Sequence, residues 1–326
     1  MREALLGLLA CPTCQSADLS LTVHARDDRE IREGELSCWA CAALIPIHKG
    51  VVRALLNPPA KVAAEAKGWV ELLDTPEKRH ELRDDWILAL PFIRPEQSPD
   101  PEAVRVWHQV GKHFFKNLDR FDWRGRRVVE LGAGRCWALA ELTRRGAYVV
   151  GLDILAHKYL GLETADIWFA AHPHVYFERV VGDMHKLPFQ PGSFDFVVTT
   201  SSLHHTDTLE PVLRQVVRVL NARGRAFFIN EPVVADTQSR PDMSNTPEVL
   251  HGIIESRPTY GEWVTAFDAA GLRVKDVRFD DDMHVLLDKQ PTPLGSKPFG
   301  SWWSAWARIK GWVKEKVRRA PSAPVY

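Results

Sequence analysis

The chain lacks four features that would assign it to a common class of protein. Its 326 residues include only five cysteines, too few for a disulfide scaffold in a chain of this length. No stretch reaches the roughly 18 consecutive apolar residues of a membrane-spanning helix, and the first residues lack the order and cleavage site of a signal peptide. Lys plus Arg and Asp plus Glu each number 42, so the formal net charge is zero, without the basic excess typical of nucleic-acid-binding proteins. These absences predict a cytoplasmic protein in a reducing compartment.

The few cysteines are unevenly distributed. Four of them form two C-x-x-C pairs near the N-terminus, with 23 residues between the pairs: Cys11, Cys14, Cys38 and Cys41. Two such pairs can supply four thiolates to one tetrahedral ion, usually zinc. An iron–sulfur cluster, two redox pairs or buried free cysteines are the alternatives. Four thiolates leave no coordination position open, so we expect a structural zinc ion that stabilises a module over residues 1–56.

The remaining chain divides into three regions. Residues 57–100 combine a charged helical pattern with the proline-rich run PFIRPEQSPDP and are predicted to form a helical linker. Strand and helix patterns then alternate over residues 101–290, which predicts an α/β domain: a Rossmann-like, seven-stranded, mostly parallel sheet with helices on both faces. The expected strands are 127–131, 147–153, 175–183, 194–201, 224–231, 272–279 and 283–289, and expected helices include 136–145, 209–220 and 260–270. Residues 291–326 form a Trp-rich basic tail.

The stretch VVELGAGRCWALAEL predicts a buried strand, a glycine turn and a helix. A dinucleotide-binding turn would have the pattern G-x-G-x-x-G, but the third glycine position holds Trp137. Glu130, two residues before Gly132, would repel a pyrophosphate and attract a cation. S-adenosylmethionine (SAM) carries both an ammonium and a sulfonium, and Gly132 and Gly134 would allow the backbone to approach it closely. The turn therefore favours SAM over a dinucleotide.

Acids at the ends of the next strands support this interpretation. Asp153 ends the second expected strand, where a carboxylate can accept hydrogen bonds from ribose hydroxyls. Asp183 ends the third, where it could bond an adenine amino group. The fourth strand runs into the polar, His-rich loop TTSSLHH at the edge where open α/β sheets bind ligands.

Five ordered segments together resemble the class I SAM-dependent methyltransferases of the type 11-like group: VVELGAGRCWALAEL, GLD, GDMHKLPFQPGSFDFVVTTSSLHHT, VLRQVVRVLNARGRAFFINEP and YGEWVTAFDAAGL. The resemblance implies that Glu130, Gly132 and Gly134 face the methionine part of the cofactor. It implies that Asp153 holds the ribose, that Asp183 and Met184 contact the adenine, and that Thr200 lines the mouth. Cys136 stands where many relatives have a third glycine, and we interpret it as a packed small residue.

The N-terminal segments LLACPTCQSADL and LSCWACAALIPIHKGVVRAL resemble the zinc ribbon of the Trm112-like family over roughly the first 56 residues. In that family too, the second cysteine pair is followed by a strand with a Pro-Ile step, here Pro46-Ile47, and a glycine turn at Gly50. The resemblance implies that the ribbon accompanies a partner or fused domain, often a methyltransferase.

Three residues at the predicted sheet edge are candidates for acid–base chemistry. An oxygen nucleophile with a high pKa requires a general base, most often histidine. His205 and His204 follow the fourth strand, and Glu231 ends the fifth. We expect SAM-dependent methyl transfer to a small-molecule or saccharide hydroxyl with a base from this set. The alternatives are a base methyltransferase acting on ribosomal or transfer RNA, which the zero net charge does not favour, and a non-catalytic SAM-binding interaction protein.

The tail SWWSAWARIKGWVKEKVRRAP places Trp302, Trp306, Ile309 and Val313 at helical spacing among basic residues. Such a helix can lie in a membrane interface with its cations towards anionic lipid. The alternative is a helix docked on its own protein or a partner. A helix in the membrane interface would give this cytoplasmic protein a peripheral contact with the membrane.

Overall fold

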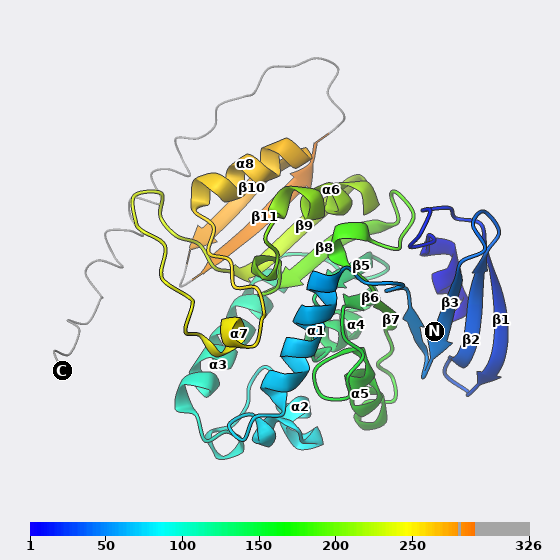
Figure 1. The fold of residues 1–326 in the computed structure, drawn as a ribbon, viewed down its shortest axis with the longest axis horizontal. Coiled ribbons are helices and arrows are strands. Elements are labelled where there is room, and N and C mark those ends of the chain that lie inside the picture. Colours follow the sequence, from blue (N-terminus) through cyan, green and yellow to red (C-terminus); the bar gives the residue numbers. More distant parts are fainter. Residues whose placement is uncertain (280–281, 291–326) are drawn as a thin grey trace.

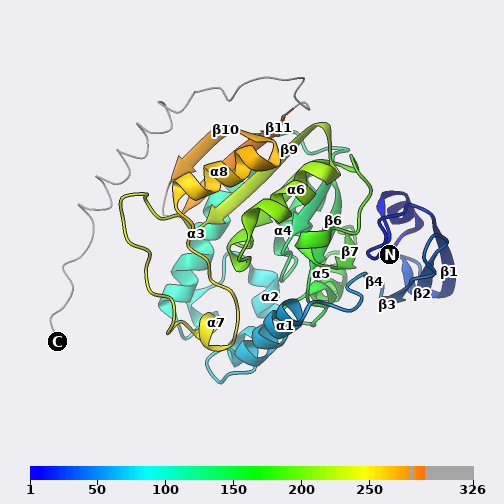
Figure 2. The same cartoon turned by 45° about the horizontal axis from the view of Figure 1, so that its top comes forward.

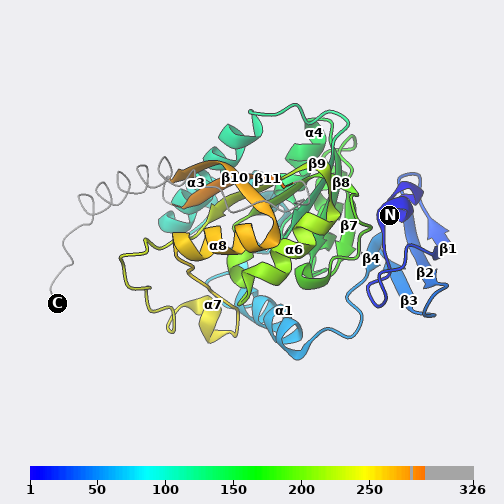
Figure 3. The ribbon, with the colours of Figure 1, turned by 90° about the horizontal axis from the view of Figure 1, so that it is seen from above.

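One continuous mixed sheet of eleven strands runs through the molecule, in the order β1-β2-β3-β4-β7-β6-β5-β8-β9-β11-β10 (Figures 1 and 3). The structure, a computed structural model, describes residues 1–279 and 282–290. The predicted tail, residues 291–326, lies outside the described residues. No helix in the described part of the chain is long and apolar enough to cross a membrane.

Seven strands form the α/β domain that the sequence predicts. Their bounds are β5 Arg127–Leu131, β6 Tyr148–Asp153, β7 Glu178–Val181, β8 Phe194–Thr200, β9 Leu220–Glu231, β10 Leu272–Phe279 and β11 Met283–Lys289. All neighbours pair in parallel except β11, which is antiparallel to both β9 and β10. The short, β-branched strands β5 to β8 are buried because helices cover both faces, as parallel sheets require.

The helices divide between the two faces of this sheet. One core cluster joins α6 (Leu209–Val219) and α8 (Tyr260–Ala270) to the sheet. A second cluster joins α2 (Asp84–Ala89), α3 (Pro101–Leu118), α4 (Trp137–Arg144) and α5 (Ala165–Ala171) to the other face. The predicted fold class of a Rossmann-like sheet between two helical layers is therefore confirmed.

The N-terminal module extends this sheet, so the total is eleven strands where the α/β domain has seven. Strands β1 (Leu19–Arg26), β2 (Ile31–Cys38), β3 (Leu44–His48) and β4 (Val51–Arg53) form an antiparallel meander. Strand β4 then pairs in parallel with β7, with Val52 opposite Val180 (Figure 2). Without this pairing β7 would be an exposed edge strand with unpaired backbone groups.

Charged side chains also hold the module against the domain, some of them buried and some partly exposed. Glu30, from the loop before β2, bonds the Arg179 guanidinium of β7 and accepts from the Met1 ammonium at 3.0 Å. Arg32 reaches Asp166 of α5 through two bonds of 3.1 Å. Leu5, Leu36 and Ile47 of the module belong to the same core cluster as the sheet and α6. The module and the domain thus share one hydrophobic core.

Residues 57–100, predicted as a helical linker, contain α1 (Ala60–Leu73), the short 3₁₀ turn Arg79–Glu81 and α2. In Figures 1 and 2, α1 lies beside the short helix α7 (Pro247–Leu250). Gly68 permits this approach, because a Cβ atom there would lie 2.1 Å from the carbonyl oxygen of His251. The segment therefore also supplies a wall over the strand ends.

Candidate functional site

A cavity of about 380 Å³ lies at the carboxyl ends of the central strands. Helix α1 with the segment that follows it, and α3, close it, and the glycine turn after β5 forms its floor. The residues from these elements are Val62, Glu65, Trp69, Leu72, Leu73, Lys78, Glu81, Val106, Trp107, Val110, Glu130, Gly132, Ala133, Gly134, Arg135 and Trp137. The strand ends and α7 add Leu152, Asp153, Ile154, Leu155, Leu160, Gly182, Asp183, Met184, His185, Thr200, Ser201, Ser202, His205 and Glu248. Every predicted cofactor-binding residue lines this one cavity.

The two glycines of the turn serve different needs. Gly132 has a φ of +71°, and a Cβ atom there would lie 2.4 Å from the Cβ atom of Ser202. Gly134 has a φ of +45°, and a Cβ atom there would meet nothing within 4 Å. Gly132 is thus required by the packing of the protein itself, whereas Gly134 leaves open space next to the cavity.

Cys136 stands where many relatives have a third glycine, and its backbone conformation is one that glycine adopts readily. It caps α4 with a φ of +62°, a left-handed conformation that glycine adopts without strain. Its thiol is buried near the carbonyl oxygens of Gly134 and Gly161, at 3.7 and 3.9 Å. Burial raises the pKa of this thiol well above its usual value, which fits a packed, unreactive residue.

The Glu130 carboxyl is the most unusual group of the cavity. Its side chain is 2% exposed, and its Oε2 atom has no hydrogen-bond partner. Burial, opposed by the neighbouring Thr200 side chain and supported by Asp153, raises the pKa of Glu130 well above its ordinary value. Thr200 Oγ1 lies beside this carboxyl, is buried, and is outside hydrogen-bonding geometry with any group of the described chain. A cationic ligand with N–H donors would supply the missing partner and restore the charged carboxylate.

Asp153 sits opposite, at the end of β6. Its two carboxylate oxygens accept bonds of 2.8 Å from the backbone N–H groups of Gly134 and Leu155. Burial nevertheless raises its pKa to about 6. Each oxygen has a second lone pair, so Asp153 can also accept hydrogen bonds from a ligand's hydroxyl groups.

Asp183 and Met184 form the third corner of the cavity. Although burial alone would raise the pKa of Asp183, hydrogen bonds from His185 lower it. One oxygen accepts from the backbone N–H and bonds Nδ1 of His185, both at 2.8 Å. His185 Nε2 contacts Thr206 Oγ1 at 2.9 Å, which ties this corner to the loop after β8. An ionised carboxylate held in this way can accept a bond from an exocyclic amine.

Comparison with known proteins agrees with this geometry. Residues 129–228 match the methyltransferase domain family. The chain is 29% identical over 136 residues to a malonyl-[acyl-carrier protein] O-methyltransferase of Legionella pneumophila, covering 41% of this chain and 46% of the relative. It is 30% identical over 122 residues to a demethylmenaquinone methyltransferase of Corynebacterium efficiens, covering 37% and 46%. Residues 129–228 therefore match a methyltransferase domain, and both relatives are similar to this chain over part of its length.

The methyltransferase fold extends beyond the matched segment. A solved geranyl diphosphate C-methyltransferase of Streptomyces coelicolor superposes with a TM-score of 0.55 at 14% identity, covering 72% of this chain and 99% of that one. At this identity the likeness concerns the fold alone. The matched segments span less than half the length of the two curated relatives, 46% of each.

His205 is the predicted base that the methyltransferase domain places in the cavity. Its Nδ1 lies 2.7 Å from the carbonyl oxygen of Ile254, which can only accept, so Nδ1 carries the proton and Nε2 the lone pair. Burial, followed by the neighbouring His204, lowers the pKa of His205 to about 3. The ring meets Trp69 of α1 edge-on, with centroids 5.2 Å apart. His205 is therefore a neutral hydrogen-bond acceptor at physiological pH.

Glu231 and His204, the other two predicted catalytic residues, do not line the cavity. Glu231 is fully buried and accepts bonds from Thr199 Oγ1 and from the backbone N–H groups of Ser202, Leu203 and His204. Its Oε2 also lies 3.0 Å from His204 Nδ1. Although burial raises it, these donors lower the pKa of Glu231 overall. The structure thus gives this pair the task of holding the loop that carries His205.

Sequence reasoning missed the contribution of α1. Glu65 lies in the cavity wall, and burial raises its pKa to about 7, with Asp153 contributing to the shift. In the sequence, KVAAEAKGW has the pattern of a charged surface helix. Only the packing of α1 across the strand ends reveals that Glu65 and Trp69 face a ligand space.

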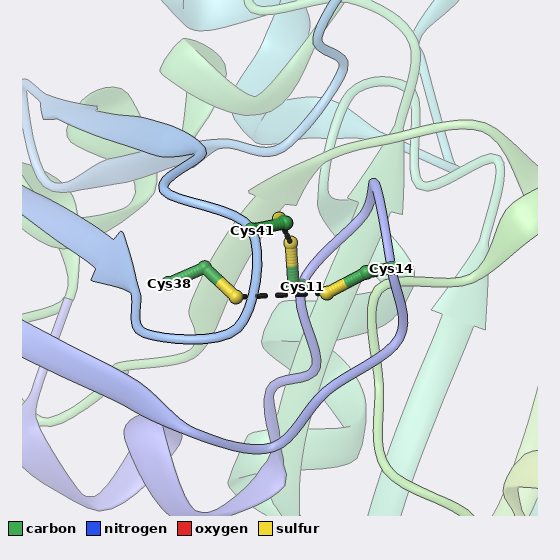
Figure 4. Close-up of side chains that lie close together, drawn as sticks. All are labelled: Cys11, Cys14, Cys38 and Cys41. Carbon is green, nitrogen blue, oxygen red and sulfur yellow. Dashed lines mark hydrogen bonds between the residues drawn. The ribbon is translucent and has the colours of Figure 1, made fainter.

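The four predicted metal ligands come together at one end of the sheet (Figure 4). Sγ atoms of Cys11 and Cys41, and of Cys14 and Cys38, lie 3.6 Å apart, too far for a disulfide bond. One sulfur atom from each residue lies within 4.8 Å of all the others. With Zn–S bonds of about 2.3 Å, a tetrahedral zinc ion would separate its sulfurs by about 3.8 Å. The four thiols therefore fit a zinc ion.

Proposed function

We propose that the protein transfers the methyl group of SAM to an apolar small-molecule acceptor. The observation that carries the proposal is the buried Glu130 Oε2 without a partner beside a glycine turn that leaves open space in the cavity. When bound, the cofactor supplies an electrophilic methyl group. The chain then has to bind it, orient the acceptor and exclude water, because an in-line displacement depends mainly on alignment.

Five groups would hold the cofactor. Glu130 accepts from the ammonium of the methionine part, and Gly134 gives the backbone room to approach it. Asp153 accepts from ribose hydroxyls, Asp183 accepts from the adenine amino group, and Met184 packs against the ring. Thr200, whose side chain lies beside Glu130, lines the same cavity.

The acceptor side of the cavity is largely apolar. Trp69 and Leu72 of α1 and Val106 and Val110 of α3 form its wall. This wall favours an aromatic or alkyl acceptor over the saccharide or RNA that the sequence leaves open. Neither curated relative described above has a nucleic acid in its name.

His205 would receive the acceptor's hydroxyl. Its Nε2 lone pair can accept the O–H hydrogen bond and aim the oxygen at the methyl group. A histidine with a pKa of about 3 is a weak base, so this arrangement suits an acceptor that is itself acidic, such as a phenol or an enol. We retain His204 and Glu231 as residues that position the loop rather than as bases.

Zinc would be structural. With Cys11, Cys14, Cys38 and Cys41 as ligands no position remains open for a substrate. The ion would hold the hairpin ends of the N-terminal module, whose β4 completes the edge of β7. Metal analysis should therefore find one zinc per chain, and Cys14→Ser should lower that ratio.

Calorimetric titration with SAM and with S-adenosylhomocysteine (SAH) tests the proposed function. We expect micromolar binding of both ligands to the wild-type protein and its loss in Asp153→Ala, whose fold is checked by circular dichroism. Absence of binding to the wild-type protein would overturn the proposal. Equal binding by the wild type and the variant would place the ligand outside this cavity.

A further inference from the structure

Three side chains with metal-binding atoms meet beside the cavity, far from the four cysteines in the sequence. His204 and His205 belong to the 3₁₀ turn after β8, and Glu255 belongs to the segment after α7. One ligand atom from each of them lies within 4.8 Å of the other two. His204 Nε2 lies 3.8 Å and His205 Nδ1 lies 3.4 Å from Glu255 Oε1. Because both separations exceed ordinary hydrogen-bond lengths, these atoms face one another across a small gap.

The separations fit a zinc ion. Zn–N and Zn–O bonds are about 2.1 Å long, so a tetrahedral ion separates its ligand atoms by about 3.4 Å. The two distances from Glu255 Oε1, 3.4 and 3.8 Å, are close to this value. Two imidazoles and one carboxylate are a recurrent set of zinc ligands, and they leave the fourth position of the ion open. Mg²⁺ and Ca²⁺ prefer oxygen ligands, so the two nitrogen atoms disfavour them.

Neighbouring groups hold the three side chains in place. His204 Nδ1 lies 3.0 Å from Glu231 Oε2, the kind of carboxylate contact that orients a histidine towards a metal ion. Arg257 donates to Glu255 Oε2 at 3.2 Å, which leaves Oε1 facing the histidines. Ser256 donates from its backbone N–H and from its hydroxyl to the His204 carbonyl oxygen, at 2.9 and 2.7 Å. The two segments that carry the ligand atoms are therefore fixed relative to each other.

We infer that His204, His205 and Glu255 form a second metal site, which binds a divalent ion of the zinc type. The ion would bond His205 through Nδ1, in place of the hydrogen bond to the Ile254 carbonyl. A neutral imidazole keeps one proton, which then moves from Nδ1 to Nε2. His205 would thereby change from a hydrogen-bond acceptor to a hydrogen-bond donor within the cavity. This last consequence rests on the proposed function, because it stops the ring from receiving the hydroxyl of the substrate.

Calorimetric titration with Zn²⁺ in the absence of SAM tests the site. The full chain is first saturated at its cysteines and dialysed until metal analysis finds one zinc per chain. Further Zn²⁺ should then bind the wild type at one ion per chain, and Mg²⁺ should not bind. Glu255→Gln keeps the size of the side chain and an oxygen that can accept from Arg257, but it loses the charged ligand. It should weaken Zn²⁺ binding by more than about 100-fold, since loss of a group that only orients a ligand already costs about 10- to 100-fold.

Glu248→Gln is the matched control. Glu248 belongs to the nearby helix α7 and is outside the cluster of three, so this variant should bind Zn²⁺ as the wild type does. Nuclear magnetic resonance of the ¹⁵N-labelled imidazole rings gives a second readout. Added Zn²⁺ should move the His205 proton from Nδ1 to Nε2 in the wild type and in Glu248→Gln. In Glu255→Gln the proton should stay on Nδ1.

The outcomes separate this site from adventitious binding and from the proposed function. If Zn²⁺ binds the wild type and Glu255→Gln with equal affinity, the ion is held by other residues and the inference is wrong. A His205 proton that stays on Nδ1 in the zinc-saturated wild type would also overturn it. Neither measurement uses SAM, so these results leave the proposed function standing. Absence of SAM binding would overturn the proposed function and leave the metal site unchanged.

Discussion

Two buried glutamates at the carboxyl ends of β5 and β9 differ in what surrounds them. Glu231 receives hydrogen bonds from four groups and contacts His204, and its pKa is lowered despite its burial. Glu130 has an oxygen without a partner, and its pKa is raised by burial. A charge that the protein completes by itself stabilises the fold, whereas a charge left incomplete marks the place of a ligand.

The largest effect should come from Glu231→Ala. The change leaves three backbone N–H groups and His204 without their acceptor in a buried loop, so the free energy of unfolding should fall by about 3 to 5 kcal/mol. Urea denaturation followed by circular dichroism measures this loss. A loss below about 1 kcal/mol would show that Glu231 does not hold the loop.

Glu130→Gln, unlike Glu231→Ala, should change SAH binding rather than the stability of the fold. The free protein should be as stable as the wild type or slightly more stable, because a carboxyl without a partner is replaced by an amide. The dissociation constant for SAH should rise by about 10- to 100-fold through loss of a charge-assisted bond. Calorimetry and denaturation of the same preparation measure both quantities. Reduced stability with unchanged SAH affinity would reverse the roles given to the two glutamates.

The pH dependence of the free energy of unfolding should distinguish the two glutamates by a smaller effect. Glu130, Asp153 and Glu65 all have raised pKa values, about 6 for Asp153 and about 7 for Glu65, so the free protein binds more protons than the unfolded chain. Their contribution to stability is therefore greatest at low pH and decreases as pH rises towards 7. Because the pKa of Glu231 is lowered, this carboxylate stabilises the fold at pH values above the ordinary pKa of a glutamate. This stabilisation is lost as the pH falls.

The pH dependence of SAH affinity should follow the carboxyl groups whose pKa values are raised. SAH needs the ionised carboxylates, so its affinity should increase between pH 5 and pH 8, by about tenfold per unit at most for each group that titrates. Glu130→Gln should flatten this profile in calorimetric titrations. Because the pKa of His205 is already about 3, this histidine should contribute no step in that range. An affinity that falls with rising pH would contradict the assignment.

The sequence predicted the parts of the fold that follow from local patterns. The bounds of β5, β10, β11 and α8 agree with the expected ranges to the residue, because alternating apolar runs end there at turn residues. Pairing of β4 with β7 was not predictable in this way, since about 130 residues separate Val52 from Val180 and no local pattern records their contact.

The candidate site also combines features that follow from local sequence patterns with features that depend on long-range packing. The glycine turn and the acids Glu130, Asp153 and Asp183 follow from position in the chain, and all of them line the cavity. The roles of Glu65 and Glu231 depend on packing between distant segments. Glu231 ends its strand as a catalytic acid would, and only its hydrogen bonds to the loop 202–204 show that its oxygens are already occupied.

The crystal structure of the SAH complex at neutral pH tests the central claim most directly. We expect the ligand's ammonium to lie within hydrogen-bond distance of Glu130 Oε2 while Glu231 keeps every contact to the loop. A complex in which Glu130 Oε2 gains no ligand partner, or in which the ligand bonds Glu231, would contradict it.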